Sequence, residues 1–448
     1  MPNALALAEQ TVPRYTSYPT APHFSAAVGA EIYADWLSAL PAAATLSLYI
    51  HVPYCTELCL YCGCHTKMVR RRAPLEAYAE KLAGEIALIA RRLGGRSVQH
   101  IHWGGGTPSI LGPDILIDLA ARLRDNFELS RIREHAVELD PRRIDRPLAQ
   151  ALAEMGVNRV SLGVQDFTPR VQEAIGRVQP LEAVTRAVRT LREVGIAKMN
   201  FDLMYGLPRQ SARDVQETAW VAATLQPRRI ALFGYAHVPW IKPHQRLIDA
   251  AALPGAGERL DQAEAARTML IALGYRPVGF DHFALPDDDL AIAARTGRLF
   301  RNFQGYTTDG ADALIGLGAS AIGRLPQGFV QNTPAVRAYS AAIDAGRHAT
   351  ARGVALSEED RIRGRIIERI LCDLEVDLEA MAGEASRSGL GRFEAELEAL
   401  QSLERQRLVE REDRRIRVTE QGRPFVRLVA AAFDVYLREG KARHSAAV

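Results

Sequence analysis

From Leu46 onward the chain alternates short β-rich runs with longer amphipathic helical patterns, and few folds accommodate that order. The β-rich runs occupy residues 46–52, 98–103, 134–139, 158–164, 197–205 and 228–235. Regular strand–helix alternation favours a parallel sheet built from βαβ units. Six units fall short of a closed eight-stranded barrel, so a partial barrel and an open sheet are both compatible. In either fold, active-site residues lie at the carboxyl ends of the strands.

The strand–helix alternation becomes less regular after Pro243, which indicates a change of architecture. We expect a lead segment at residues 1–45, a barrel domain with an extension at 46–345, and a mostly helical C-terminal domain at 346–448. The pattern of the last domain predicts three helices, a hairpin at 408–419 and an apolar helix. This order is typical of a winged helix. The hairpin charges are mixed in sign, which favours a packing role over DNA binding.

Composition is that of an ordinary globular protein and excludes several functional classes. Of 448 residues, 48% are hydrophobic, so disordered and fibrous classes do not apply. The 56 Lys and Arg against 53 Asp and Glu give +3, too little to indicate a nucleic-acid partner for the whole chain. The sequence has neither a signal peptide nor a stretch of 18 apolar residues. We therefore expect a cytoplasmic, monomeric protein without a membrane partner.

Four of the five cysteines crowd one short segment directly after the first β-rich run. Cys55, Cys59, Cys62 and Cys64 read C-x3-C-x2-C-x-C, whereas Cys372 stands in an apolar helical pattern typical of a buried residue. Thiolates are soft ligands that suit zinc or an iron–sulfur cluster. Structural zinc usually uses two separated C-x2-C pairs, so the crowding favours a cluster, with zinc as the alternative. Three thiolates would leave one iron open to another ligand.

The three-cysteine spacing after the first strand resembles the radical S-adenosylmethionine (SAM) superfamily. A glycine-rich turn, Gly104–Gly106 followed by Thr107 and Pro108, ends the second run and is similar to the GGTP motif of that superfamily. Glycines in such a turn let the backbone approach a ligand closely. The resemblance implies a partial (β/α)6 barrel that carries a [4Fe–4S] cluster held by Cys55, Cys59 and Cys62, with Cys64 outside the ligand set.

Within the superfamily, the chain resembles the oxygen-independent coproporphyrinogen III oxidases (dehydrogenases) along nearly its whole length. The matching phrases are PRYTSYPT (13–20), HWGGGTP (102–108), GVQDF (163–167), NFDLMYGLP (200–208), GYAHVP (234–239), DHFALPDDDLA (281–291) and RNFQGYTT (301–308). A related branch of haem-binding chaperones typically has Phe in place of Cys64 and lacks the first and last phrases. That branch remains the alternative function, and an iron–sulfur transcription factor is a third.

The resemblance implies decarboxylation of two propionates of coproporphyrinogen III to the vinyl groups of protoporphyrinogen IX, with two SAM molecules consumed. No protein side chain is basic enough to remove hydrogen from an unactivated carbon, so a cofactor-derived radical is needed. The resemblance implies that this radical is the 5′-deoxyadenosyl radical. A reducing donor such as a flavodoxin or ferredoxin is implied as a partner.

The resemblance also implies residue roles, carried over position by position. The cluster-bound SAM is expected to contact Tyr49, Gly105, Glu138 and Ile322. The second SAM is expected to contact Tyr61, Gly106, Thr107, Gln165, Arg177, Asp202 and Ala236.

Substrate contacts are expected from arginines, because the planar guanidinium binds carboxylates bidentately. The candidate catalytic residues are Arg14, Tyr49 and Arg301, the two arginines standing in family-like phrases. The lead phrase at 13–20 is bounded by prolines, which disfavour a helix. We expect it to form a flap over the substrate, in which Tyr15 and Tyr18 exclude water; a passive surface strap is the alternative.

Overall fold

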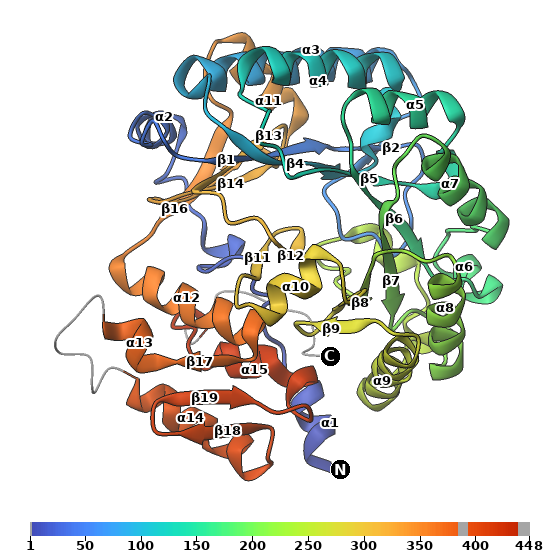
Figure 1. Cartoon of the computed structure of the whole chain (residues 1–448), viewed down its shortest axis with the longest axis vertical. Helices are drawn as coiled ribbons and strands as arrows, with labels where there is room; N and C mark the ends of the chain where they lie inside the picture. Colours follow the sequence, from blue (N-terminus) through green and yellow to red (C-terminus); the bar gives the residue numbers. More distant parts are fainter. Residues whose placement is uncertain (1, 384–392, 438–448) are drawn as a thin grey trace.

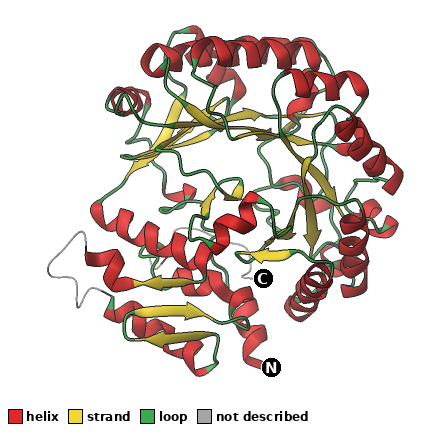
Figure 2. Cartoon of the chain, viewed as in Figure 1, coloured by secondary structure: helices red, strands yellow, loops and turns green. Residues whose placement is uncertain are grey.

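The computed structural model describes residues 2–383 and 393–437, and its main element is a curved sheet (Figures 1 and 2). Within those ranges the sheet has twelve strands in the order β16-β15-β14-β13-β1-β4-β5-β6-β7-β8-β10-β9. The two edge strands do not pair with each other, so the barrel is open. The expected partial barrel is confirmed.

The six predicted β-rich runs are all strands, and neighbours among them pair in parallel. Their bounds are β1 Leu46–Val52, β4 Val98–Gly105, β5 Glu134–Leu139, β6 Arg159–Gln165, β7 Lys198–Tyr205 and β8 Arg229–Gly234. Their outward residues pack against helices and are almost fully buried, which explains the apolar, β-branched composition of the runs.

The stretch after Pro243, where the strand–helix alternation weakens in the sequence, contributes strands to both sides of the sheet. β13 (Ala313–Leu317) adds a seventh parallel strand beside β1. Antiparallel strands then extend the two edges: β14 Ile322–Leu325, β15 Gly328–Asn332 and β16 Thr350–Ala355 on one side, and β9 Arg276–Val278 and β10 His282–Ala284 on the other. β16 belongs to this sheet although it follows residue 345, where the barrel domain was expected to end.

Helices cover the convex side of the sheet, as Figure 1 shows. They are α3 Ala73–Leu93, α4 Pro113–Asn126, α5 Arg146–Glu154, α6 Pro169–Ala174, α7 Leu181–Glu193, α8 Ala212–Thr224, α9 Ala256–Ala272 and α11 Val336–Asp344. In α7 the apolar residues at helical spacing, Val184, Val188 and Leu191, are buried against the sheet. Ser211 caps α8 by accepting a hydrogen bond from the backbone N–H of Asp214.

Ion pairs lie inside the open barrel, at the amino ends of its strands. Arg159 and Arg229 approach Glu134 at 2.7 and 3.4 Å and Asp288 at 3.5 and 2.6 Å. The small hairpin of β11 (Phe300–Asn302) and β12 (Gly305–Thr307), followed along the chain by β13, and helix α10 (Asp289–Arg295) lie within the curve of the sheet in Figure 1.

The C-terminal domain contains the expected helices and hairpin. Its elements are α12 Glu358–Asp373, β17 Glu375–Asp377, α13 Leu378–Gly383, α14 Glu394–Arg405, β18 Val409–Glu412, β19 Arg415–Val418 and α15 Val426–Ala431. The extra strand β17 completes a three-stranded sheet in the order β17-β19-β18. None of the helices in the described ranges is long and apolar enough to cross a membrane.

Residues 1–45 do not form a unit of their own. The first part, with α1 (Pro2–Ala8), buries Leu7, Val12, Tyr15 and Tyr18 in the hydrophobic core of the C-terminal domain. The second part, with α2 (Ala30–Ser38), contacts α3 and β16 of the barrel. The segment at 13–20 is not helical, as the prolines predicted.

Candidate active site

The cysteine loop lies at the carboxyl end of β1, where the sequence placed it. Cys55 ends the short strand β2 (Tyr54–Cys55), which pairs with β3 (Lys67–Met68) across the base of the loop. Cys59 is buried, Cys55 and Cys62 are half-buried, and Cys64 is exposed; all are free thiols. A hydrogen bond with Cys64 lowers the pKa of Cys62 to about 7, which favours the thiolate that a metal requires.

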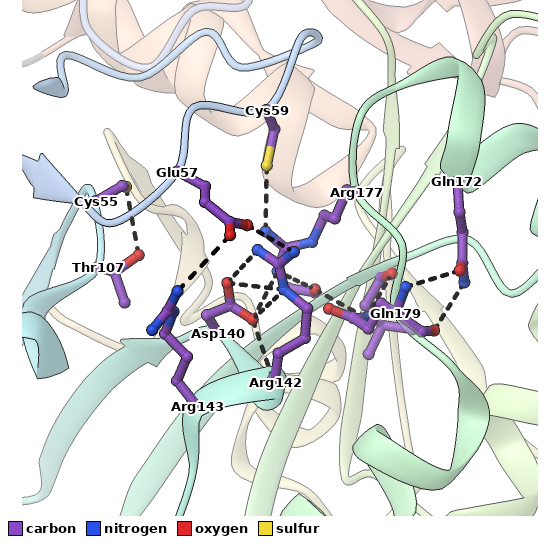
Figure 3. A network of polar contacts seen from close by, with 12 residues as sticks. Cys55, Glu57, Cys59, Thr107, Asp140, Arg142, Arg143, Gln172, Arg177 and Gln179 are labelled. Atoms are coloured by element: carbon purple, nitrogen blue, oxygen red, sulfur yellow. Dashed lines mark hydrogen bonds and ion pairs between the residues drawn. The ribbon is translucent and has the colours of Figure 1, made fainter. Parts of the chain in front are cut away.

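Polar groups from three segments surround the sulfur atoms. Thr66 donates a hydrogen bond from Oγ1 to Cys55 Sγ at 3.3 Å, and Thr107 Oγ1 lies 3.4 Å from the same sulfur. Arg177 donates from Nη1 to Cys59 Sγ at 3.4 Å (Figure 3). Burial outweighs the two threonine hydrogen bonds and raises the pKa of Cys55. Hydrogen bonds to the sulfur atoms of a cluster tune the bound cluster, and the polar groups around this loop are placed to supply them.

Arg177 is itself held by a chain of ion pairs, visible at the centre of Figure 3. Its Nη2 lies 3.5 Å from Asp140, which binds Arg142 at 2.7 Å, and Arg142 reaches Glu57 of the cysteine loop at 3.2 Å. Burial opposes the charge on Arg177, but Tyr61 and Asp140 outweigh it and the pKa of Arg177 is raised. The guanidinium is therefore charged and fixed in position.

A second loop holds the cysteine loop by its backbone. Lys242 Nζ donates to the carbonyl of Cys64 at 2.9 Å and Gln245 Nε2 to that of Tyr61 at 2.9 Å, while His244 Nε2 lies 2.8 Å from the Cys62 carbonyl. These contacts fix the loop without using its side chains. Sequence reasoning missed them, because a side chain bound to a backbone carbonyl leaves no motif.

The glycine-rich turn at the end of β4 approaches the loop too closely for any side chain. A Cβ on Gly106 would lie 2.4 Å from the carbonyl oxygen of Tyr54, and Gly105 has a φ of +107°. The Gly105 N–H donates to Glu138 Oε2 at 3.2 Å, and Glu138 Oε1 is 3.0 Å from His102 Nε2. Burial would raise the pKa of Glu138, but His102 outweighs it and the pKa is lowered. Glu138 thus presents a carboxylate beside the turn.

Two further expected residues lie close to this carboxylate. Tyr49 on β1 shares a hydrogen bond with His51 Nδ1 at 2.9 Å, and its ring stacks on that of His102 with a centroid distance of 6.0 Å. Tyr49 pairs with Gly316 of β13, and a Cβ on Gly316 would lie 2.8 Å from Ile322. The structure therefore brings the residues expected for the first SAM into one neighbourhood.

Three of the residues expected for the second SAM, Gln165, Arg177 and Asp202, lie on β6, after β6 and on β7. Asp202 accepts hydrogen bonds from Ser161 Oγ and Asn200 Nδ2, each at 2.8 Å. Burial, reinforced by the charge of Glu138, raises the pKa of Asp202 to about 7. Gln165, at the end of β6, has a φ of +67° and a buried Oε1 without a hydrogen-bond partner. Ala236 follows β8.

The donor set fits the cofactors that the sequence implied. In the described part of the chain, no three His, Cys, Asp or Glu side chains surround one point as the ligands of a single metal ion would. Thiolates spaced along a loop instead suit a cluster, whose irons occupy separate corners. The tight glycine turn, the carboxylate of Glu138 and the orphaned Gln165 Oε1 offer both close backbone approach and unused polar groups to a ligand such as SAM.

The two candidate arginines lie apart from the cysteines and contact each other. Arg14 donates from Nη2 to the carbonyl of Gly234, at the end of β8, at 2.6 Å. Arg301 donates to the Arg14 carbonyl at 3.4 Å and faces Asp281 at 3.6 Å, with its side chain buried between the rings of Phe280 and Tyr306. Arg301 therefore already has an anionic partner in the fold.

The partial barrel with its thiolate loop at the end of the first strand is the architecture of a radical SAM enzyme. The Radical SAM superfamily profile matches residues 49–219, and that of the HemN C-terminal domain matches residues 356–425. A [4Fe–4S] cluster and SAM are accordingly the cofactors of this oxidoreductase.

Relatives that match nearly the whole chain show to which family of radical SAM enzymes it belongs. The oxygen-independent coproporphyrinogen III oxidase of Bradyrhizobium diazoefficiens is 48% identical over 457 residues, covering 99% of each chain, and that of Escherichia coli K12 is 38% identical, covering 96% and 94%. The solved Escherichia coli coproporphyrinogen III oxidase HemN, described as a radical SAM enzyme, superposes with a TM-score of 0.90 at 37% identity, covering 95% of this chain and 100% of that one. The chain belongs to the family of oxygen-independent coproporphyrinogen III oxidases.

Proposed function

We propose that this chain converts coproporphyrinogen III to protoporphyrinogen IX without oxygen, turning two propionates into vinyl groups. One observation carries the proposal: the three-cysteine loop meets the glycine-rich turn through Cys55 and Thr107, and the turn meets Glu138 through Gly105, at the carboxyl ends of β1, β4 and β5. When bound, the reduced cluster and SAM supply a 5′-deoxyadenosyl radical that removes a hydrogen atom from a propionate. The protein's own task is to bind, orient and shield.

The cluster is held by Cys55, Cys59 and Cys62, and Cys64 is not a ligand. Three protein ligands leave one iron for SAM, in the same way that catalytic metal sites keep an open position. The exposed position of Cys64 agrees with a separate role, which includes the hydrogen bond that favours the Cys62 thiolate.

The first SAM binds against the turn and the end of β5. Glu138, kept as a carboxylate by His102, pairs with the cationic amine or a ribose hydroxyl. The backbone at Gly105 and the residue pair Tyr49 and Ile322 complete the wall. Backbone carbonyls of a glycine turn accept from an ammonium group without a side chain between them.

A second SAM binds on the β6–β7 side of the same opening. The residues assigned to it are Tyr61, Gly106, Thr107, Gln165, Arg177, Asp202 and Ala236. Support comes from the unused Oε1 of Gln165 and from the raised pKa of Asp202, because a cationic ligand beside a buried carboxylate would restore its charge.

Protein reconstituted with iron and sulfide under anaerobic conditions provides the test. Reductive SAM cleavage is measured with and without coproporphyrinogen III, together with vinyl product by mass spectrometry. Substrate-dependent cleavage with protoporphyrinogen IX formation is expected. Stable haem binding without product would instead favour the haem-binding chaperone function. The proposal includes a monomeric, cytoplasmic protein reduced by a flavodoxin- or ferredoxin-like donor, testable by sedimentation and by reduction with purified carriers.

A further inference from the structure

A run of basic residues follows the cysteine loop directly. Four of the six residues at 67–72 are basic, and all four are exposed: Lys67, Arg70, Arg71 and Arg72. We call residues 67–72 the basic run. Charge of one sign that is concentrated on a surface attracts a partner of the opposite charge and speeds its approach.

Backbone pairing ties the basic run to one of the cysteines assigned to the cluster. Met68 pairs with Cys55 where β3 lies beside β2, and the Val69 N–H donates to the Cys55 carbonyl at 2.9 Å. Cys55 is half-buried, whereas Cys59 is buried. The basic run therefore lies where a cluster ligand comes close to the protein surface.

The basic run leads toward the outer surface of the barrel. Its last residue, Arg72, pairs with Glu76 of α3 at 2.7 Å and lies 3.8 Å from Asp114 of α4. Both helices cover the convex side of the sheet (Figure 1). A protein that contacts the basic run would therefore approach Cys55 from outside the barrel.

The positive charge of the basic run is offset only at its end. Among the ion pairs of the described residues, Arg72 is the one member of the run that takes part. Within the cysteine loop itself, Glu57 pairs with Arg142 at 3.2 Å and approaches Arg143 at 3.9 Å (Figure 3). The nearby carboxylate of the loop is thus engaged with other arginines, and the first three basic residues of the run add net positive charge to the surface.

Two exposed apolar side chains accompany these charges. Leu58, in the cysteine loop, is 36% exposed, and Met68, in the basic run, is 55% exposed. Protein interfaces combine apolar contacts, Met among them, with a polar rim. Nucleic-acid interfaces depend mainly on contacts with phosphates. The combination therefore favours a protein partner with an acidic surface.

We propose that the basic run, together with Leu58, is the docking surface for a small, acidic, one-electron carrier protein that reduces the cluster. The inference rests on the proposed function, which needs an electron from outside the chain. The carrier loses one electron and the cluster gains it, and no bond forms between the two proteins. Electron transfer slows steeply with distance, which favours docking beside Cys55. Charge attraction at this surface mainly raises the association rate, and salt weakens it.

Binding of purified carriers tests the docking surface without turnover. Oxidised flavodoxin and, in parallel, a [2Fe–2S] ferredoxin are titrated anaerobically into the reconstituted protein by calorimetry, at low and at high salt. For Arg70→Gln/Arg71→Gln we expect the Kd at low salt to rise roughly 3- to 30-fold, the range for loss of two exposed ion pairs. The difference should shrink at high salt. Met68→Ser should raise the Kd at both salt concentrations, because it removes an apolar contact.

The matched control is Arg405→Gln/Arg407→Gln, which removes the same charge from exposed positions at the end of α14. Figure 1 places α14 in the lower part of the molecule and β2 in the upper part. The Kd of this variant should equal that of wild type. An equal loss of binding in the control would mean that net charge attracts the carrier, and would overturn the proposal. Iron content and near-UV circular dichroism verify that each variant holds the cluster and folds.

Two further results would also overturn the docking surface. The first is that wild type binds neither carrier, or that Arg70→Gln/Arg71→Gln binds them as tightly as wild type does. The second is that an RNA oligonucleotide binds wild type more tightly than either carrier and loses its binding in the same variant. That result would assign the basic run to a nucleic acid.

Reduction kinetics separate this inference from the proposed function. With reduced flavodoxin, Arg70→Gln/Arg71→Gln should slow reduction of the cluster in stopped-flow absorbance. Photoreduction with deazaflavin, which needs no docking, should reduce variant and wild type equally and give equal SAM cleavage. Wild type that is reduced through this surface but makes no vinyl product would support the docking surface and contradict the proposed function. Wild-type rates of reduction and product formation in the variant, with flavodoxin as the reductant, would contradict the docking surface alone.

Discussion

Arg177 Nη1 donates a hydrogen bond to Cys59 Sγ over 3.4 Å, which joins the segment after β6 to the cysteine loop. The same guanidinium donates from Nη2 to the carbonyl of Gly163 at 2.8 Å. A cation fixed beside a cluster ligand stabilises the more negative, reduced cluster. With a cluster bound to Cys59, we therefore expect Arg177 to favour the reduced form of that cluster.

We expect Arg177→Met to make the cluster harder to reduce. Losing one charged hydrogen bond shifts the midpoint potential by roughly 60 mV to more negative values, equivalent to a tenfold change for one electron. Redox titration followed by electron paramagnetic resonance, without SAM, measures the shift. Arg143→Met is the control, since Arg143 is exposed and only approaches Glu57 at 3.9 Å. Equal potentials for the Arg177 variant and wild type would show that the contact has no redox role.

Ligand assignment in the cysteine loop is tested by single Ser substitutions. Cys55→Ser, Cys59→Ser and Cys62→Ser should lose most of the iron and the visible absorption of the cluster under anaerobic conditions. Cys64→Ser should keep both, because Cys64 is exposed and three thiolates suffice. A loss of iron in Cys64→Ser as large as in Cys59→Ser would indicate a closed four-cysteine cluster and contradict the open iron.

We expect Asp202 to be needed for product formation but not for assembly of the cluster. Asp202→Ala removes a buried carboxylate held by Ser161 and Asn200, which lie on the neighbouring strand and two residues away. Iron content and absorption should match wild type, whereas product formation should fall at least about a hundredfold, as for loss of a positioned charged group. Quantifying protoporphyrinogen IX decides the matter: normal amounts from this variant would remove Asp202 from the second SAM site.

The sequence predicted the parallel core because each of its strands is long enough to show a pattern. β1 to β8, apart from the two short strands in the cysteine loop, have six to eight residues and are bounded by amphipathic helices. Apart from β16, which has six residues, the strands missed after Pro243 have three to five residues, too few for any periodicity to stand out. β13 pairs with β1 across more than 260 residues of sequence, a long-range register that local patterns do not encode.

Functional residues that stand at fixed intervals in the sequence could be predicted, whereas residues that only the fold brings together could not. Three cysteines and three glycines at fixed intervals identified the cluster loop and the turn. The contacts of Lys242, His244 and Gln245 with the loop backbone depend only on how two loops meet in space.

The tyrosines of the lead segment, which was expected to form a flap, contact the C-terminal domain. Tyr15 donates to Asp434 Oδ2 at 3.0 Å, Tyr18 accepts from the Val435 N–H at 3.3 Å, and both rings are buried with the C-terminal core. Deleting residues 1–20 should therefore destabilise the protein by several kcal/mol, as removal of several core side chains does, rather than leave folding intact. Thermal unfolding measures the loss; an unchanged Tm would show that the segment is dispensable for packing.

Glu85 gives the barrel a pH-dependent stability. This carboxyl on α3 is 2% exposed and accepts hydrogen bonds from the Gly318 N–H at 2.6 Å, Tyr339 Oη at 2.8 Å and Asn332 Nδ2 at 2.7 Å. Burial outweighs these donors and raises its pKa from 4.5 to about 7. The folded state therefore binds the proton more tightly than the unfolded chain. The resulting stabilisation is complete below pH 4.5 and is lost as the pH rises through 7.

Glu85→Gln removes this titration while keeping a neutral side chain of the same shape. Between pH 5 and pH 8 the wild-type free energy of unfolding should fall relative to that of the variant by an amount on the order of 3 kcal/mol, the equivalent of the pKa shift. Urea unfolding at both pH values measures the difference. Glu80→Gln, an exposed change on the same helix, is the control and should follow wild type. Parallel pH profiles for wild type and Glu85→Gln would show that Glu85 is ionised in the fold throughout, and that its hydrogen bonds compensate fully for burial.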